Sequence, residues 1–357
     1  DVERSRGLGD VYKRQGVFKE FPFTRPSEYY YNWKSLLEHY QKPFVDDIMK
    51  YHTNHIVNLT MGFKYPAMLS YFFDDMDFEK ITEMGLRSAH RYHGVVSGVV
   101  NGDEHLAGNN PSRGSELCSV VEYMFSLQTM AEAFGTGRYT DQIEKLAYNA
   151  LPATITEDFM AHQYLQQANQ VLVSKAKRDW FNTNDESNLF GLEPNFGCCT
   201  ANMHQGWPKL LKSMWLKEDE NTLISMVHGP SSIVTELAGN RVSISEETEY
   251  PFKNRICYRV TEGNAPSAVF RIWIPEWCKD FRVCIDGAWK NRERTEDYLT
   301  VHGLHAGSEM TVEFSMDIRK SFWYKDSMAI ERGPLVFALD MNCLLYTSPS
   351  PRDLSTS

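Results

Sequence analysis

The sequence predicts a chain in two parts, a helical barrel followed by an antiparallel β-sandwich. Two observations predict this order. Apolar residues recur every three or four positions from residue 27 to about residue 215, as they do in amphipathic and buried helices. After about residue 220 apolar and polar residues alternate, and glycine turns recur at short intervals. A polar run separates the two patterns, so we place the boundary between residues 218 and 219.

Three segments carry the helical pattern most clearly. The segment 77–94 begins with a candidate N-cap, Asp77, and ends at a glycine. The segment 115–135 is apolar almost all round, so we expect a buried helix that ends at its final glycine. The segment 139–155 has one apolar stripe and should end near Pro152. Paired helices without a sustained heptad favour a toroid over a coiled coil.

The alternating part of the sequence predicts a series of short strands. Polar or glycine-containing turns separate them at the spacing that is typical of a β-sandwich. The predicted strands cover residues 241–247, 255–260, 268–275, 281–287, 298–303 and 309–318.

The two ends of the chain differ from the sequence beside them. Residues 1–15 and 343–357 resemble translated sequencing-adapter read-through, and the second stretch is rich in Ser, Thr and Pro without an apolar period. We exclude both from the fold prediction. We expect the chain to be a piece of a longer protein and to be inactive alone, because an opened barrel exposes apolar surface. The location, cytoplasmic or periplasmic, and the oligomeric state stay open.

Charge and hydropathy exclude several classes of partner. The chain has 47 acidic and 37 basic residues, and its net charge of −10 argues against nucleic acid or an anionic membrane as the main partner. The sequence contains no run of 18 apolar residues, so we predict no membrane span. Aromatic residues make up 13% of the chain, which would suit stacking on a carbohydrate, although we expect most of them in the core.

Two of the seven cysteines are adjacent, Cys198 and Cys199 in the stretch FGCCTAN. A disulfide prefers Cα atoms about 5.5 Å apart, whereas neighbouring Cα atoms lie about 3.8 Å apart, so these two do not readily bridge each other. Three other cysteines fall in the region of the predicted strands, where a free thiol usually fills the core. They are Cys257, Cys278 and Cys284.

A further cysteine, Cys118, lies two residues after a carboxylate, Glu116. Their side chains converge only if Glu116 precedes the first helical turn, and Ser115 is a candidate cap there. One carboxylate and three thiolates suit tetrahedral Zn²⁺. The spacing matches no zinc finger or ribbon, however, and on chemistry alone three unrelated buried thiols are the stronger alternative.

Several motifs in order resemble glycoside hydrolase family 127, whose best-known activity is β-L-arabinofuranosidase. The motifs span nearly all of residues 27–342, and the resemblance implies that residues 16–218 form part of an (α/α)₆ barrel and residues 219–342 a β-sandwich. They read NHIVNLTMGFKYPAMLSYFF, RYHGVVSGVVNGDEHLAGNNPSRGSELCSVVEYMFSLQ, HQYLQQANQ, FGCCTANM and ERGPLVFALD.

The resemblance implies a zinc site and two catalytic groups. The family's zinc ligands fall on Glu116, Cys118, Cys198 and Cys199, and its nucleophile falls on Cys198. The general acid/base is best matched by Glu104 in NGDEHLAG. A metal-bound thiol is deprotonated, which would make Cys198 a nucleophile at neutral pH. The implied function is a zinc-dependent retaining hydrolase that removes L-arabinofuranose or a related sugar from plant-type glycans.

The resemblance also implies substrate contacts. The family's sugar-binding His and Tyr fall on His55 and Tyr164, and His105 is either a further contact or a hydrogen-bonding residue of its loop. The chain departs from the family after the cysteine pair, where Thr200 and Ala201 stand in place of two prolines. This departure leaves the sugar and the linkage open.

Two other function classes fit a helical toroid. A zinc-independent sugar epimerase or uronide hydrolase would need no thiolates, so a Cys198→Ser variant would keep its activity. A non-catalytic carbohydrate-binding protein would keep its affinity for sugar after loss of Glu104. The combination of the Glu-x-Cys and Cys-Cys motifs favours the hydrolase.

Overall fold

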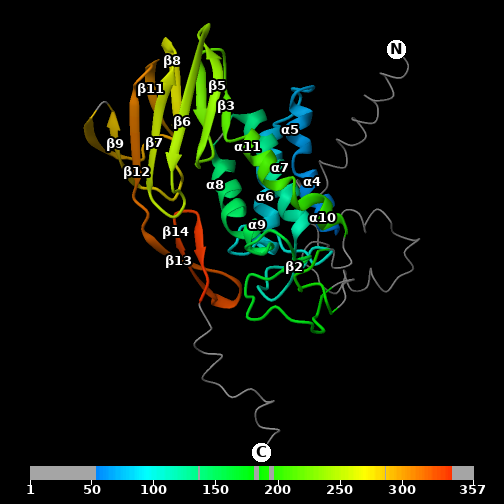
Figure 1. The fold of residues 1–357 in the computed structure, drawn as a ribbon. Helices are drawn as coiled ribbons and strands as arrows, with labels where there is room; N and C mark the ends of the chain where they lie inside the picture. The colour runs from blue at the N-terminus through cyan, green and yellow to red at the C-terminus, as the bar shows by residue number, and fades with distance from the viewer. Residues whose placement is uncertain (1–53, 136, 181–184, 193–196, 286, 340–357) are drawn as a thin grey trace, which may run out of the picture.

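The structure is a computed structural model, and helices precede sheets along its chain (Figure 1). The described residues are 54–135, 137–180, 185–192, 197–285 and 287–339. The predictions for both ends of the chain, including the two adapter-like stretches, lie outside these residues. None of the helices in the described ranges combines the length and the apolar character needed to cross a membrane.

The α-helices of the described part run up to Lys212. They are α4 (Ile56–Gly62), α5 (Tyr65–Ser70), α6 (Phe78–His93), α7 (Leu117–Phe134), α8 (Arg138–Lys145), α9 (Leu151–Ala153), α10 (Gly197–Met203) and α11 (Gly206–Lys212). A π-helical turn, η3 (Leu146–Ala150), joins α8 to α9.

Helix α7 is the centre of the helical part (Figure 1). It is buried along almost its whole length and contacts α4, α5, α8, α10 and α11. It ends at Gly135, which takes the left-handed conformation with φ of +65°, as the sequence predicts. The predicted cap of α6 is also confirmed, because the Asp77 carboxylate accepts a hydrogen bond from the Lys80 N–H. The (α/α)₆ barrel stays a prediction.

The third predicted helix is interrupted. The π turn η3 lies in its middle. Pro152 falls in the first turn of α9, where a backbone N–H has no partner within the helix, so a proline is tolerated there. The Asn149 side chain in this turn donates to the Pro334 carbonyl at 2.9 Å and accepts from the Val336 N–H at 2.8 Å. The irregular turn therefore faces a β-strand of the second part, which the local sequence pattern did not reveal.

The β part contains two larger sheets and one small sheet within the described residues. The six-stranded sheet has the order β10-β9-β12-β7-β6-β5, the four-stranded sheet β11-β8-β4-β3, and the three-stranded sheet β13-β14-β15. Their strands are β3 (Trp215–Lys217), β4 (Thr222–Ser225), β5 (Ser231–Leu237), β6 (Asn240–Thr248), β7 (Arg255–Glu262), β8 (Asn264–Trp273), β9 (Asp280–Ile285), β10 (Ala288–Glu293), β11 (Tyr298–His305), β12 (Glu309–Phe314), β13 (Ile318–Phe322), β14 (Met328–Arg332) and β15 (Leu335–Phe337).

The two larger sheets pack face to face, as the alternation predicts. Tyr258 of β7 is buried and meets Phe270 of β8 edge-on, with ring centres 5.3 Å apart. The prediction of a purely antiparallel sandwich was wrong in one place, because β4 pairs with β8 in parallel. Strand β4 was not among the predicted strands, and an alternating pattern does not specify the direction of pairing.

Side chains join the helical part to the sheets. The indole N–H of Trp273 donates to the Asp141 carboxylate at 2.9 Å, and Lys145 pairs with Glu331 at 2.7 Å. These contacts hold the small third sheet and the end of strand β8 against α8.

Candidate active site and metal centre

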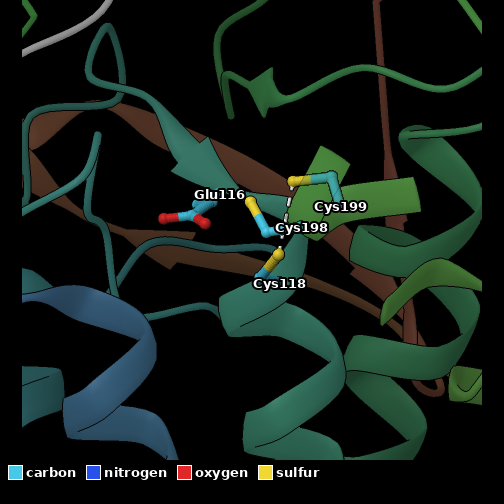
Figure 2. A group of neighbouring side chains, drawn as sticks. All are labelled: Glu116, Cys118, Cys198 and Cys199. Atoms are coloured by element: carbon cyan, nitrogen blue, oxygen red, sulfur yellow. Dashed lines mark hydrogen bonds between the residues drawn. The ribbon is translucent and has the colours of Figure 1, made fainter. Parts of the chain in front are cut away.

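Glu116, Cys118, Cys198 and Cys199 form one cluster, with a carboxylate oxygen and three sulfur atoms all within 4.8 Å of one another. Figure 2 shows the three sulfurs gathered together with the Glu116 carboxylate beside them. The Sγ atoms of Cys118 and Cys199 are 3.4 Å apart, and all three cysteines are free thiols. The residues that the sequence singles out are thus brought together from segments about 80 positions apart.

The start of α7 explains how Glu116 and Cys118 converge. Glu116 has an extended backbone and lies in β1 (Ser115–Glu116), so it is not yet helical. Strand β1 pairs with β2 (Leu165–Gln166), and the Leu117 N–H donates to the Tyr164 carbonyl at 3.0 Å. The prediction that Ser115 caps the helix was wrong, because its hydroxyl instead donates to the Asn101 side chain at 2.6 Å.

The cluster fits a zinc ion by its donor set. Tetrahedral Zn²⁺ with Zn–S bonds of about 2.3 Å separates two sulfurs by about 3.8 Å, close to the spacing of Cys118 and Cys199. The Glu116 side chain is buried, and among the described residues its Oε2 accepts no hydrogen bond. A buried carboxylate oxygen needs a donor or a cation, so the site is chemically suited to a metal.

The three thiols of the cluster differ in pKa and in exposure. Hydrogen bonds from Cys118 and Cys199 lower the pKa of Cys198, whereas burial raises the pKa of Cys199. Burial and the nearby Glu104 charge raise the pKa of Glu116 well above its ordinary value. Cys198 is exposed while Cys118 and Cys199 are buried, so Cys198 is the cluster's accessible sulfur.

Glu104 lies on a tight loop between two backbone bridges. Its φ is +89°, a conformation that is costly for a residue with a side chain. The loop returns on itself through the Gly102–Leu106 bridge, and Gly102 packs so closely on Ile56 that no side chain could be added there. The strained backbone is therefore held by its surroundings and directs the Glu104 carboxylate into the site.

Two predicted substrate contacts hold the Glu104 carboxylate. His55 Nδ1 accepts from the Asn58 N–H, so Nε2 carries the hydrogen that it donates to Oε1 at 3.2 Å. The Tyr164 hydroxyl donates to Oε2. These two hydrogen bonds lower the pKa of Glu104, although burial alone would raise it. One nitrogen of His55 and one carboxylate oxygen each of Glu104 and Glu116 lie within 4.8 Å of one another, which joins Glu104 to the cysteine cluster.

His105 lies directly beside His55. Its side chain is fully buried, and its ring packs edge-on against His55 with ring centres 5.7 Å apart. The choice between a substrate contact and a hydrogen-bonding residue of the loop stays a prediction for His105.

Thr200 is joined to His162, a histidine whose role the sequence does not decide. His162 Nδ1 donates to the Gln163 carbonyl at 3.1 Å, so Nε2 accepts the Thr200 hydroxyl at 2.9 Å. Thr200 directly follows the cysteine pair, and this bond ties α10 to the loop before β2. The sequence does show that Thr200 replaces the first of the two prolines in the family pattern. A proline has no hydroxyl to donate, so this replacement is what indicates the bond.

Comparison with known families agrees with the geometry. The profile of the GH127 β-L-arabinofuranosidase catalytic domain matches residues 78–212, and that of the GH127 middle domain matches residues 222–323. The chain belongs to glycoside hydrolase family 127. No curated protein matches the sequence significantly.

Solved structures of the family share the fold of this GH127 chain. A GH127 β-L-arabinofuranosidase from Geobacillus stearothermophilus T6, Ara127N-Se, superposes with a TM-score of 0.69 at 18% identity, covering 91% of this chain and 55% of that one. The GH127 β-arabinofuranosidase BT3674 gives 0.63 at 18% identity, covering 79% and 47%. A further glycoside hydrolase gives 0.69 at 15% identity, covering 79% and 51%. The chain spans about half the length of these structures.

Proposed function

We propose that this chain carries the catalytic centre of a zinc-dependent retaining glycoside hydrolase that removes L-arabinofuranose or a related sugar from plant-type glycans. Cys198 is the nucleophile and Glu104 the general acid/base. The observation that carries the proposal is the exposed Cys198 sulfur in a cluster whose Glu116 carboxylate lies beside that of Glu104. Membership of family 127 supports the reaction class.

The reaction proceeds in two halves. The Cys198 thiolate attacks the anomeric carbon, the glycosidic C–O bond breaks, and the Glu104 carboxyl gives its proton to the leaving oxygen. A thioglycosyl bond to Cys198 results. Glu104 then takes a proton from water, the water oxygen attacks the anomeric carbon, and the C–S bond breaks to regenerate the thiolate. Two inversions at one carbon retain its configuration.

The surroundings of Glu104 suit a group that changes role. Hydrogen bonds from His55 and Tyr164 fix both carboxylate oxygens and favour the ionised base needed in the second half. The charge of Cys198 acts in the opposite direction and raises the pKa of Glu104. That charge disappears when the sulfur carries the sugar, so the Glu104 carboxyl holds its proton more tightly before attack and ionises more readily afterwards.

The two buried thiols and Glu116 would hold Zn²⁺ together with Cys198. When bound, zinc keeps thiol ligands deprotonated, which supplies an ionised Cys198 at neutral pH. Cys118 and Cys199 cannot reach solvent, so they serve as holding ligands while Cys198 meets the substrate.

Metal content and hydrolysis test the proposal together. We expect about one zinc per chain by mass spectrometry in the full-length protein, and loss of that zinc in a Cys199→Ser variant. We expect Cys198→Ser to abolish release of nitrophenol from nitrophenyl β-L-arabinofuranoside.

The matched control is Cys257→Ser, since Cys257 is a half-buried free thiol in β7, far from the site in sequence and in the fold. It should keep both zinc and activity. Absence of zinc from freshly reduced protein, or full activity in Cys198→Ser, would contradict the thiolate mechanism.

A further inference from the structure

A pocket of about 460 Å³ opens beside the loop that carries Glu104. The helical part supplies most of its wall, and the turn between β13 and β14 supplies Tyr324. Figure 1 shows that turn beside the loops that follow β2. The lining includes Asn109, Arg113, Gln167, Asp179, Trp180 and Tyr324. The volume falls in the range of small-molecule sites, which often lie between domains.

An aromatic side chain is fixed in the wall of this pocket. The Trp180 indole N–H donates to the Ser112 carbonyl at 3.2 Å, and the Arg178 guanidinium lies 5.0 Å from its ring centre. Arg178 is in turn held by the Ser174 carbonyl at 3.0 Å and the Asn188 side chain at 3.1 Å. A ring that is already oriented offers a flat apolar face without further ordering, as sugar stacking requires.

The charges of the pocket are internally paired. Arg113 lies 3.7 Å from the Asp103 carboxylate and 3.2 Å from that of Asp179. Asp103 is fully buried, so one positive charge meets two negative ones at this wall, while Arg178 adds a second positive charge beside Trp180. The balance favours a neutral ligand, and the amide groups of Asn109 and Gln167 suit sugar hydroxyls.

The ribbon formed by β1 and β2 connects the pocket to the active site. Glu116 and Tyr164 lie at one end of this ribbon, and Arg113 and Gln167 lie at the other. An extended chain rises about 3.3 Å per residue, so the backbones of Arg113 and Glu116 are at most about 10 Å apart. A short oligosaccharide spans that distance.

We propose that the pocket at Trp180 and Tyr324 is a second sugar subsite, which binds a neutral sugar unit of the oligosaccharide whose terminal unit occupies the active site. The choice of an arabinose-containing ligand rests on the proposed function. The pocket then selects for substrate length, since a monosaccharide cannot occupy the active site and the pocket at the same time.

Calorimetric titration of the full-length protein with L-arabinose, an arabinobiose and an arabinotriose tests the subsite. We expect affinity to rise with length. Trp180→Ala should weaken arabinotriose binding about tenfold or more and leave arabinose binding unchanged. Tyr324→Ala serves as a second variant, because Trp180 also packs on the core.

Trp289→Ala is the matched control. Trp289 lies in β10 at the edge of the sandwich, is 41% exposed and also stacks on an arginine, Arg282, at 4.5 Å. It should bind arabinotriose like the wild type. Unchanged arabinotriose binding in both pocket variants, tighter binding of an acidic digalacturonate, or no binding of any probe to the wild type would overturn the subsite. Length-dependent binding that Trp180→Ala removes, without any hydrolysis of arabinofuranosides, would instead refute the proposed function and leave the subsite standing.

Discussion

A buried carboxylate between the helices and the sandwich, Glu144 of α8, should control how stability depends on pH. Its side chain is fully buried and accepts hydrogen bonds from the Tyr250 hydroxyl and from the His228 N–H at 3.0 Å. These two hydrogen bonds do not fully replace the hydration that the ionised carboxylate loses on burial. Burial raises the pKa of Glu144 from 4.5 to about 7, and Asp141 on the same helix adds to the rise. The perturbation that tests this is Glu144→Gln.

The other titratable groups here act in the same direction. His228 is buried among Glu144, Glu246 at 3.7 Å and Tyr258 at 3.1 Å. Burial lowers the pKa of His228, but the two carboxylates outweigh it and raise the pKa. Burial also raises the pKa of Asp141, to about 6. Each of these groups therefore binds protons more tightly in the folded state than in the unfolded state.

The sign and the magnitude follow from linkage. A group with a raised folded pKa contributes its stability below the unfolded pKa and loses it as pH rises through the folded pKa. For Glu144 this window runs from 4.5 to about 7. One pKa unit corresponds to about 1.4 kcal/mol, so ionising this side chain costs on the order of 3 kcal/mol by pH 8. A glutamine does not ionise, and its one oxygen keeps an acceptor for one of the two donors. The loss of the other acceptor costs the same at every pH, so it does not enter the difference between two pH values.

Urea unfolding at pH 5 and pH 8 measures the difference. We expect Glu144→Gln to gain stability relative to the wild type between these pH values, by on the order of 3 kcal/mol. Glu249→Gln is the control, because Glu249 is 68% exposed and pairs with Lys253 on the surface. If the two variants show the same change between pH 5 and pH 8, the reasoning from burial is refuted.

Two further predictions concern the active site and the contact between the parts. Tyr164→Phe removes a hydrogen bond to Glu104 and should lower kcat about 10- to 100-fold with little change in KM, as steady-state kinetics would measure; an unchanged kcat would argue against the acid/base role. Gly137→Ala places a methyl group into the Trp273 ring and should destabilise the fold by about 1–3 kcal/mol in urea unfolding. Gly62→Ala, whose nearest contact would be 3.8 Å away, should be neutral or stabilising, and equal losses in both variants would contradict the prediction.

The features that could be predicted from the sequence are those that neighbouring residues determine. The ends of α6 and α7 follow from Asp77 and Gly135, whose effects act within one turn. The alternation of β6 to β8 follows from burial on one face. The parallel pairing of β4 with β8 was not predictable, because both pairing directions allow the same alternation.

The candidate site divides in the same way. The four residues of the cysteine cluster were found from donor chemistry and from the family resemblance, and the structure brings them together. Glu104 takes its positive φ in a loop whose Gly102 packs closely on Ile56, 46 positions away in the sequence. The spacing of residues along the sequence does not indicate which distant segments will pack together. Neither this strained backbone nor the pocket at Trp180 could therefore be predicted.

Thr200 connects the departure from the family pattern to the position of the nucleophile. The cysteine pair lies on α10, a helix of seven residues, which is too short to hold its own orientation. A proline after the pair would stiffen the backbone, whereas Thr200 anchors it by a hydrogen bond to His162 at 2.9 Å. His162 in turn lies two residues before Tyr164, which holds Glu104. One loop therefore positions both the helix of the proposed nucleophile and the carboxylate of the proposed acid/base, so a change at Thr200 should disturb the two groups together.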